Sequence, residues 1–461
     1  MSEEPTQSES DRACPPSAAA ASPIPLTDFE CYMLLDDRPS HPMVITMALQ
    51  LTGDLKQDLF GVAINESLEN HPLLRSIVVG KKLRLSWQPT DSRPAVDWSN
   101  GISKNAPPVP YVDLTQTIGL QVRGEWTEGR SVVYFFFHHA CCDGISSVRF
   151  IAEVLSRYGR LEANPDTLPL PVFQHEQLLR RDEVKSQDKL RPRASVFIKE
   201  VTTIFTKRAL RLRQSAVRVA EDQGRAIITR TLPRFSVRQL RSAASQLGVS
   251  LNDLCTAEFA RTLKEWNGTN CGTGAGRLRL IVPVSTRLPK HDEMSAANCI
   301  SYLPIEFNPA EMSDAAVVAR AVHARTAAAL DCNFGLLFLK ALSVARHLPW
   351  VLGWFTARKR RLCTAIFASV GDIRRHVPVG FSQSQGRLVA GNIRVDRIDG
   401  VAPIRPNTAV AVSCGTYAGD MIFNLRADSA ILSNDDADML LDSFVAQLQS
   451  HCQPQTAKVA A

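Results

Sequence analysis

Apolar and polar positions alternate with strand-like and helix-like periods along the first half of the chain. HPMVITMALQLTGDL is apolar enough for a buried strand that ends at Gly53, and KQDLFGVAINESLENHPLL has apolar residues at helical spacing. Gln121 to His139 has the composition of a hairpin, whose second arm is SVVYFFFHH. After Gly144, apolar residues recur every three or four positions, which predicts an amphipathic helix.

The second half repeats this pattern. RAIITRTLP is strand-like, SVRQLRSAASQLG is a helix ended by Gly248, and SLNDLCTAEFARTLKEWNG is a helix capped by Ser250. RLRLIVPVSTR is a strand that runs into Arg287, and NCISYLPIEF is another strand. Helical patterns at 312–330 and 335–361 precede the strand-like stretches LCTAIFASVG, LVAGNIRVDRID and TAVAVSCGTYAGDMIFNLRAD, and SNDDADMLLDSFVAQLQSH is a closing helix. Strands and helices interspersed in both halves predict an α/β protein with two similar lobes.

The length of 461 residues is sufficient for two or three lobes. We expect residues 23–175 to form an N-terminal lobe and residues 226–452 a C-terminal lobe. Residues 176–225 form a predicted basic linker or helical segment between them. The start, 1–22, is acidic and rich in small residues and is expected to be a disordered tail, and 453–461 is a second tail.

The charge distribution and the cysteines indicate which binding partners and which cellular compartment to expect. The net charge is +7, and many basic residues lie between Arg180 and Arg218 among apolar ones, a pattern that suits an anionic membrane, an acidic protein or a solvated linker. No nucleic-acid-binding motif accompanies this charge, so no nucleic-acid partner is expected. The 11 cysteines lack regular spacing, and the start has no signal-peptide features, which predicts reduced thiols in the cytoplasm.

The most apolar long segment, FGLLFLKALSVARHLPWVLGWF, is interrupted by charged residues and by Pro349. It is therefore too discontinuous for a membrane-spanning helix. Because RKRR follows shortly after it, the segment fits a peripheral position on a bilayer surface. A buried helix beside a solvated basic turn is the alternative interpretation.

The stretch FFFHHACCDGISSVRF carries the candidate chemistry. Successive strand residues point to opposite faces, so His138 and His139 do not readily share a metal, and no third ligand stands at a zinc spacing; no metal site is expected. One histidine should face the core and the other a cleft, and strand alternation alone does not decide which. A neutral imidazole at a strand end suits general-base work on a hydroxyl or an amine, although histidines on apolar strands more often serve the core.

The residues after the histidines suggest a rigid loop. Gly144 permits a tight reversal or a close approach of ligand to backbone, and a partly buried Asp143 needs a cation or several donors. Arg287, at the end of RLRLIVPVSTR, is the expected bidentate partner, which makes Asp143 an organiser of the site rather than a proton carrier. Cys141 and Cys142 are expected to be buried, inert thiols rather than a redox switch.

HHACCDG, at 138–144, resembles the HHxxxDG motif of the chloramphenicol acetyltransferase-like superfamily, which includes condensation domains, polyketide-associated acyltransferases and wax ester synthases. PLTDFECYMLLDD, HPLLRS, GVSLNDLCTAEFARTL and VPVSTR also stand where such proteins carry similar stretches, and the resemblance covers about residues 23–452. It implies two lobes, each with a mixed sheet and helices, around a central tunnel that is open at both ends.

The resemblance also implies an acyltransferase without a bound cofactor. The acyl group would come from acyl-coenzyme A or from the phosphopantetheine thioester of an acyl-carrier protein, and pass to an alcohol or an amine without a covalent acyl-enzyme. His139 would point into the tunnel and take the acceptor proton, while His138 and Asp143 shape the loop and Arg287 pairs with Asp143. Ser369, in ASVGDIRR, is a candidate substrate-binding residue, although the sequence there departs from the stretch in wax-ester-type relatives.

Two other functions stay open at this stage. A non-catalytic docking module would use the same fold without its chemistry, but the presence of both histidines, Asp143 and Arg287 favours catalysis. Hydrolysis of a thioester requires only that water replaces the acceptor. Ester and amide formation are not separated by the sequence, because the same base serves either acceptor.

Overall fold

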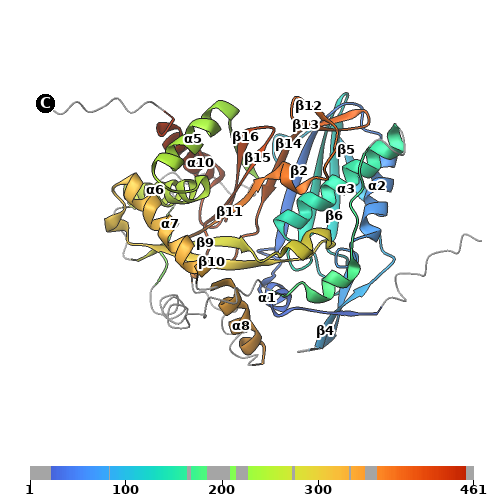
Figure 1. The fold of residues 1–461 in the computed structure, drawn as a ribbon, viewed down its shortest axis with the longest axis horizontal. Helices are drawn as coiled ribbons and strands as arrows, with labels where there is room; N and C mark the ends of the chain where they lie inside the picture. Colours follow the sequence, from blue (N-terminus) through green and yellow to red (C-terminus); the bar gives the residue numbers. More distant parts are fainter. Residues whose placement is uncertain are drawn as a thin grey trace, which may run out of the picture.

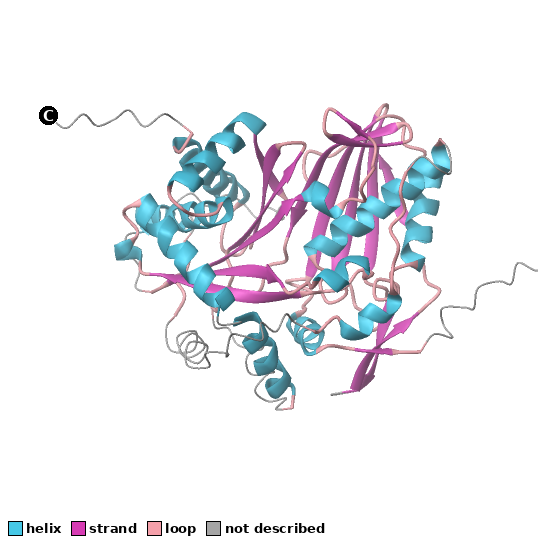
Figure 2. Ribbon diagram, in the orientation of Figure 1, coloured by secondary structure: helices cyan, strands magenta, loops and turns pink. Residues whose placement is uncertain are grey.

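The computed structural model consists of two lobes, each built from a β-sheet and the helices packed against it (Figure 1; Figure 2). It describes residues 22–81, 84–163, 168–183, 208–213, 227–271, 276–331, 334–347 and 361–452. The predicted terminal tails and most of the predicted basic linker lie outside the described residues. The strands and helices of each lobe alternate along the chain, which confirms the predicted α/β class with mixed sheets.

The larger sheet has seven strands in the described part of the chain, in the order β12-β13-β14-β2-β7-β6-β5. Their bounds are β2 (Val44–Thr52), β5 (Val96–Asn100), β6 (Leu120–Thr127), β7 (Arg130–His138), β12 (Gln383–Ser384), β13 (Arg387–Ala390) and β14 (Ile393–Val401). Strands β5 and β6 are parallel, and the other neighbours are antiparallel. A separate small sheet has the order β1-β4-β3, with β1 (Ile24–Pro25), β3 (Ser76–Lys81) and β4 (Arg84–Pro89).

The second lobe is built on a sheet with the order β10-β9-β11-β15-β16-β8. Its strands are β8 (Ile228–Leu232), β9 (Leu278–Ser285), β10 (Ile300–Phe307), β11 (Ala365–Asp372), β15 (Val410–Tyr417) and β16 (Asp420–Ala427). Strand β11 runs parallel to both β9 and β15, and the remaining pairs are antiparallel. The carboxyl ends of β9 and β11 therefore lie on the same edge of the sheet.

Two of the helices begin at clear capping side chains. Thr27 and Glu30 form a capping box at the start of α1 (Asp28–Asp36), and Ser433 accepts from the Asp436 N–H at the start of α10 (Asn434–Ser450). The other α-helices are α2 (Gln57–Glu69), α3 (Gly144–Glu162), α5 (Arg234–Gln246), α6 (Leu251–Cys271), α7 (Ala315–Asp331) and α8 (Phe334–Arg346).

Aromatic side chains hold α2 and α3 against the larger sheet. Phe135 and Phe137 on β7 contact Phe150 of α3 edge-on, and Phe60 of α2 contacts Phe135, with ring centroids 5.7 to 6.4 Å apart. All four rings are fully buried. This packing holds the end of β7 and the start of α3 together, and the two histidines lie at that junction.

One predicted assignment to a lobe changes in the structure. The stretch LVAGNIRVDRID forms β13 and β14, which turn at Gly391, and β14 pairs with β2 in the N-terminal lobe's sheet although the sequence analysis places it in the C-terminal lobe. Such pairing between distant segments leaves no local signal. The predicted helical pattern at 335–361 forms α8 up to Arg346, and most of the remainder, residues 348–360, lies outside the described residues.

No single helix within the described ranges is long and apolar enough to cross a membrane. Helices α7 and α8 reach that length and hydropathy only when they are taken together, and they meet at a bend of 59°.

Candidate active site

The two histidines lie where β7 ends and the chain turns toward α3. His138 is the last residue of β7 and pairs with Val44 of β2. The backbone N–H of His139 donates to the Met43 carbonyl at 2.7 Å. Helix α3 starts at Gly144 with Asp143 as its N-cap residue. The loop between strand and helix is thus held at both ends.

His139 lies on the wall of a cavity of about 110 Å³. Its Nδ1 is 2.9 Å from the Cys142 carbonyl oxygen. A carbonyl only accepts, so Nδ1 carries the proton and Nε2 has a free lone pair. The Asn298 amide nitrogen donates to the His139 carbonyl at 2.6 Å and fixes the backbone of the same residue.

Burial lowers the pKa of His139, and the Cys142 carbonyl and the Asp143 carboxylate only partly oppose that effect. The imidazole is therefore neutral at pH 7. A neutral ring with its proton fixed on Nδ1 can accept a proton at Nε2, which is the requirement for a general base.

His138 is fully buried and, unlike His139, is not part of the cavity wall. Its Nδ1 accepts from the Ala140 N–H at 3.1 Å, and its Nε2 lies 3.4 Å from an Asp37 carboxylate oxygen. The ring thus connects the loop to the residue that follows α1. Between the two histidines, the structure places His139 on the cavity side, which strand alternation alone left undecided.

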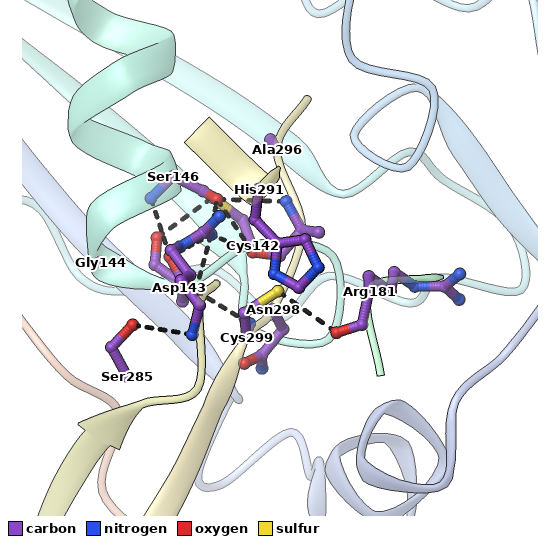
Figure 3. A network of polar contacts seen from close by, with 12 residues as sticks. Cys142, Asp143, Gly144, Ser146, Arg181, Ser285, His291, Ala296, Asn298 and Cys299 are labelled. Carbon is purple, nitrogen blue, oxygen red and sulfur yellow. Dashed lines mark hydrogen bonds and ion pairs between the residues drawn. The ribbon is translucent and has the colours of Figure 1, made fainter. Parts of the chain in front are cut away.

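Asp143 is the centre of a polar network between the lobes (Figure 3). Its two carboxylate oxygens accept from the backbone N–H groups of Ser146, at 2.8 Å, and Cys299, at 2.9 Å. Burial by itself would raise the pKa of Asp143, but the nearby Arg287 guanidinium and these donors lower it overall. The carboxylate is therefore ionised and bound by donors from both lobes; its role as an organiser of the loop stays a prediction.

Arg287 contacts Asp143, as the sequence predicts, but in a different geometry. A single guanidinium nitrogen, Nη2, lies 3.0 and 2.9 Å from the two carboxylate oxygens, so the predicted two-nitrogen fork does not form. The same nitrogen donates to Ser146 Oγ at 2.5 Å and to the Ala297 carbonyl at 3.1 Å. One side chain from the C-terminal lobe thereby holds the turn that carries His139.

The segment just before β10 supplies site residues that sequence reasoning missed. Asn298 holds the backbone of His139, Cys299 donates to Asp143, and Ala297 exchanges hydrogen bonds with Ser146. The only local signal is a polar residue directly before a buried strand. These contacts join residues about 150 positions apart, so a local sequence pattern cannot predict them.

The cavity lies between the two lobes and is lined mostly by apolar side chains. Strands β2 and β14 and the start of α3 contribute one wall, and β9, β11, β15 and β16 contribute the other. Gly144 lines it, and a Cβ there would lie 3.2 Å from a Val370 methyl group, so the glycine serves a close approach. Ser369 and Ser413 also line it. A substrate-binding role for Ser369 stays a prediction.

The cysteines of the motif are inert, as predicted. Cys141 and Cys142 are fully buried, and burial raises the pKa of both thiols well above their ordinary value. Burial therefore disfavours the thiolate form, which a nucleophile or a redox sensor needs. In the described part of the chain, no group of three or more His, Cys, Asp or Glu residues is placed to hold a metal ion.

No protein-family profile and no curated protein matches the sequence. The fold nevertheless matches solved structures over nearly the whole chain. The starter condensation domain of rhizomide synthetase, solved with C8-CoA and Leu-SNAC, is 14% identical with a TM-score of 0.65, and the match covers 94% of this chain and 95% of that one. Polyketide synthase associated protein 5 from Mycobacterium tuberculosis is 15% identical, with a TM-score of 0.61 and coverages of 94% and 99%. The trichothecene 15-O-acetyltransferase from Fusarium sporotrichioides is 12% identical, with a TM-score of 0.67 and coverages of 92% and 94%.

Proposed function

We propose that this chain, which has the two-lobed chloramphenicol acetyltransferase-like fold of these structures, is an acyltransferase. It moves an acyl group from a coenzyme A or carrier-protein thioester to an alcohol or an amine. The observation that carries the proposal is the His139 ring at the cavity wall, with its Nδ1 proton bound by the Cys142 carbonyl and its Nε2 free. Acyl-coenzyme A bound to a condensation domain of the same fold supports the choice of donor.

In this mechanism, His139 acts as the general base. Nε2 takes the proton of the acceptor hydroxyl or amine while the acceptor oxygen or nitrogen attacks the thioester carbonyl. The tetrahedral intermediate then collapses, the carbon–sulfur bond breaks, and the imidazolium returns the proton to the leaving thiolate. The Cys142 carbonyl stabilises the imidazolium through Nδ1 in the meantime. No protein nucleophile is needed, and the buried thiols beside His139 are unsuited to be one.

The cavity wall suits the acyl part of the substrate. Ile45, Met47, Ile398 and Ile422 are among its side chains, and such a surface favours a hydrocarbon group over a charged one. The polar groups of the wall are His139 and Asp143 on one side and single residues of β9, β11, β15 and β16 on the other: Ser285, Ser369, Ser413 and Asn424. Transfer therefore takes place where an apolar pocket meets the base.

The pH dependence of kcat/KM should report the lowered pKa of His139. Only the neutral imidazole can accept the acceptor proton, so the rate falls as the pH drops through that pKa. Because burial moves the pKa below the ordinary value of about 6.5, we expect the acid limb to lie below pH 6.5. A limb well above that value, measured with a saturating donor, would contradict His139 as the base.

Mass spectrometry of reaction mixtures tests the proposed activity directly. The purified protein is incubated with acyl-coenzyme A and acyl-carrier thioesters and with pooled alcohols and amines, beside the His139→Ala variant. A new ester or amide that disappears in the variant supports the proposal. Thiol release without an acylated product would indicate hydrolysis. If the protein is folded and no substrate pair of the panel gives a product or free thiol, the result would indicate a docking module.

A further inference from the structure

Arg426, on β16, is a buried arginine that the proposed chemistry does not use. It is only 8% exposed, and its Nη1 has no hydrogen-bond partner. Burial lowers the pKa of its guanidinium to about 10, and Asp428 opposes that effect only from a distance. A buried cation without a partner destabilises the unliganded protein. An anion that is not part of the protein would remove this cost when it binds to Arg426.

The other buried arginines among the described residues are paired with carboxylates. Arg279 lies on β9 of the same sheet, and its Nε donates at 2.5 Å to Glu306, the residue directly opposite it on β10. Arg181 donates to Glu30 at 2.6 Å. Arg426 forms no such pair within the described ranges. The contrast identifies Arg426 as the buried guanidinium whose carboxylate the fold does not supply.

Asp428 does not fill that place. Its Oδ2 lies 3.2 Å from His41 Nε2, and its Oδ1 accepts from the Ala430 N–H at 3.0 Å. Both oxygens are thus committed to groups other than the guanidinium.

Strand alternation places Arg426 on the same face of β16 as two residues of the cavity wall. Asn424 and Ile422, two and four residues earlier on β16, both line the cavity that contains His139. Residues two apart on a strand share a face, so Arg426 lies on the face of those two, about 13 Å along the strand from Ile422. The residue opposite it on β15 is Ala411, whose small side chain carries no charge and cannot pair with the guanidinium.

A second, polar cavity begins on the same side. It measures about 440 Å³, and Ile227, next to the end of β8 that pairs with Leu425, contributes to its wall. Asn424 connects the two cavities, because it lines the apolar one while its amide contacts Thr229 of the polar one at 2.9 Å. Arg426 lines neither cavity itself, but it lies two residues along β16 from Asn424, the residue that joins them, and on the same strand face.

We propose that Arg426 binds a carboxylate carried by the substrate. This inference rests on the proposed acyl transfer and narrows its substrates to those with an acidic group remote from the reacting carbon. A carboxylate fits better than a phosphate, because one guanidinium neutralises one negative charge and its planar donors match a planar acceptor. The carboxylate belongs either to the far end of the acyl chain or to the acceptor.

Substrate pairs of equal length identify the source. Adipyl-coenzyme A is compared with hexanoyl-coenzyme A as donor, and ω-hydroxyhexanoate with hexanol as acceptor, in the wild type and in Arg426→Met. The wild type should favour the acidic member of one pair by roughly tenfold or more, and Arg426→Met should lose that preference while it keeps the rate on the neutral member. Equal ratios in both proteins for both pairs would overturn the proposal.

Heat unfolding provides a readout that does not depend on turnover. Without substrate, Arg426→Met should unfold at a higher temperature than the wild type, because an unpaired buried charge is removed. The matched control, Arg279→Met, should unfold at a lower temperature, because it leaves Glu306 without its partner. Adipate or ω-hydroxyhexanoate should raise the unfolding temperature of the wild type but not of Arg426→Met.

These outcomes separate this inference from the proposed function. If no acyl transfer is found but an acid stabilises the wild type through Arg426, the carboxylate site stands and the acyltransferase assignment fails. If transfer occurs and Arg426→Met is less stable than the wild type and unchanged in its substrate preference, the carboxylate site is wrong and the acyltransferase assignment stands.

Discussion

Replacing His139 with alanine should lower kcat by roughly 10² to 10⁴, the range that a general base contributes. The residual rate would come from the binding of donor and acceptor next to each other. The affinity for the acyl donor should change little, because the ring acts on the acceptor proton rather than on the acyl chain. Steady-state kinetics with the best donor and acceptor from the mass-spectrometry panel measure both quantities.

The stability of His139→Ala should stay close to that of the wild type. The variant loses one hydrogen bond, to the Cys142 carbonyl, which is worth about 1 kcal/mol. His376 offers a matched control, because it is a partly buried histidine, binds the backbone of the cavity residue Val370 at 3.2 Å, and does not line the cavity. His376→Ala should keep the wild-type rate. A full rate in His139→Ala, or an equal loss in both variants, would contradict the base assignment.

Local patterns in the sequence predict most of the elements that surround this site. The capping side chain of Ser250, the apolar run before His138 and the helix after Gly144 all act within a few residues, and each element forms as expected. The helix start after Gly144 and the contact of Asp143 with Arg287 are also found as predicted, whereas His139 as the base stays a prediction. The strand β5 was missed, because VDWSN is short and half-exposed and follows a proline-containing stretch.

The parts of the site that the sequence does not predict are those made by distant segments. Asn298 reaches His139 across 159 residues, and β14 joins β2 across more than 300. Such contacts depend on how the lobes pack, which no period of two or 3.6 residues encodes. The partner of Asp143 was predictable because Arg287 ends a buried strand. Its one-nitrogen geometry was not, because it depends on Ser146 and Ala297 as well.

Breaking the ion pair between Asp143 and Arg287 should destabilise the protein by about 3 to 5 kcal/mol. Removing either side chain leaves the other as a buried charge without a partner. Asp143→Asn is the appropriate single variant, since asparagine still caps α3 and only the charge is lost. Arg287→Met removes the other partner. The free energy of unfolding of both variants can be measured by denaturant titration.

The double variant Asp143→Asn/Arg287→Met distinguishes a true pair from two separate roles. Both charges are then absent, so its loss of stability should be clearly smaller than the sum of the two single losses. Additive losses would mean that the two side chains act independently, despite Nη2 lying within 3.0 Å of both carboxylate oxygens.

Activity should fall in all three variants, because the turn that carries His139 loses its anchor. An acid limb of kcat/KM should persist in Asp143→Asn, moved to lower pH, because Asp143 transfers no proton but its carboxylate raises the pKa of His139. Loss of the limb would make Asp143 a proton carrier instead.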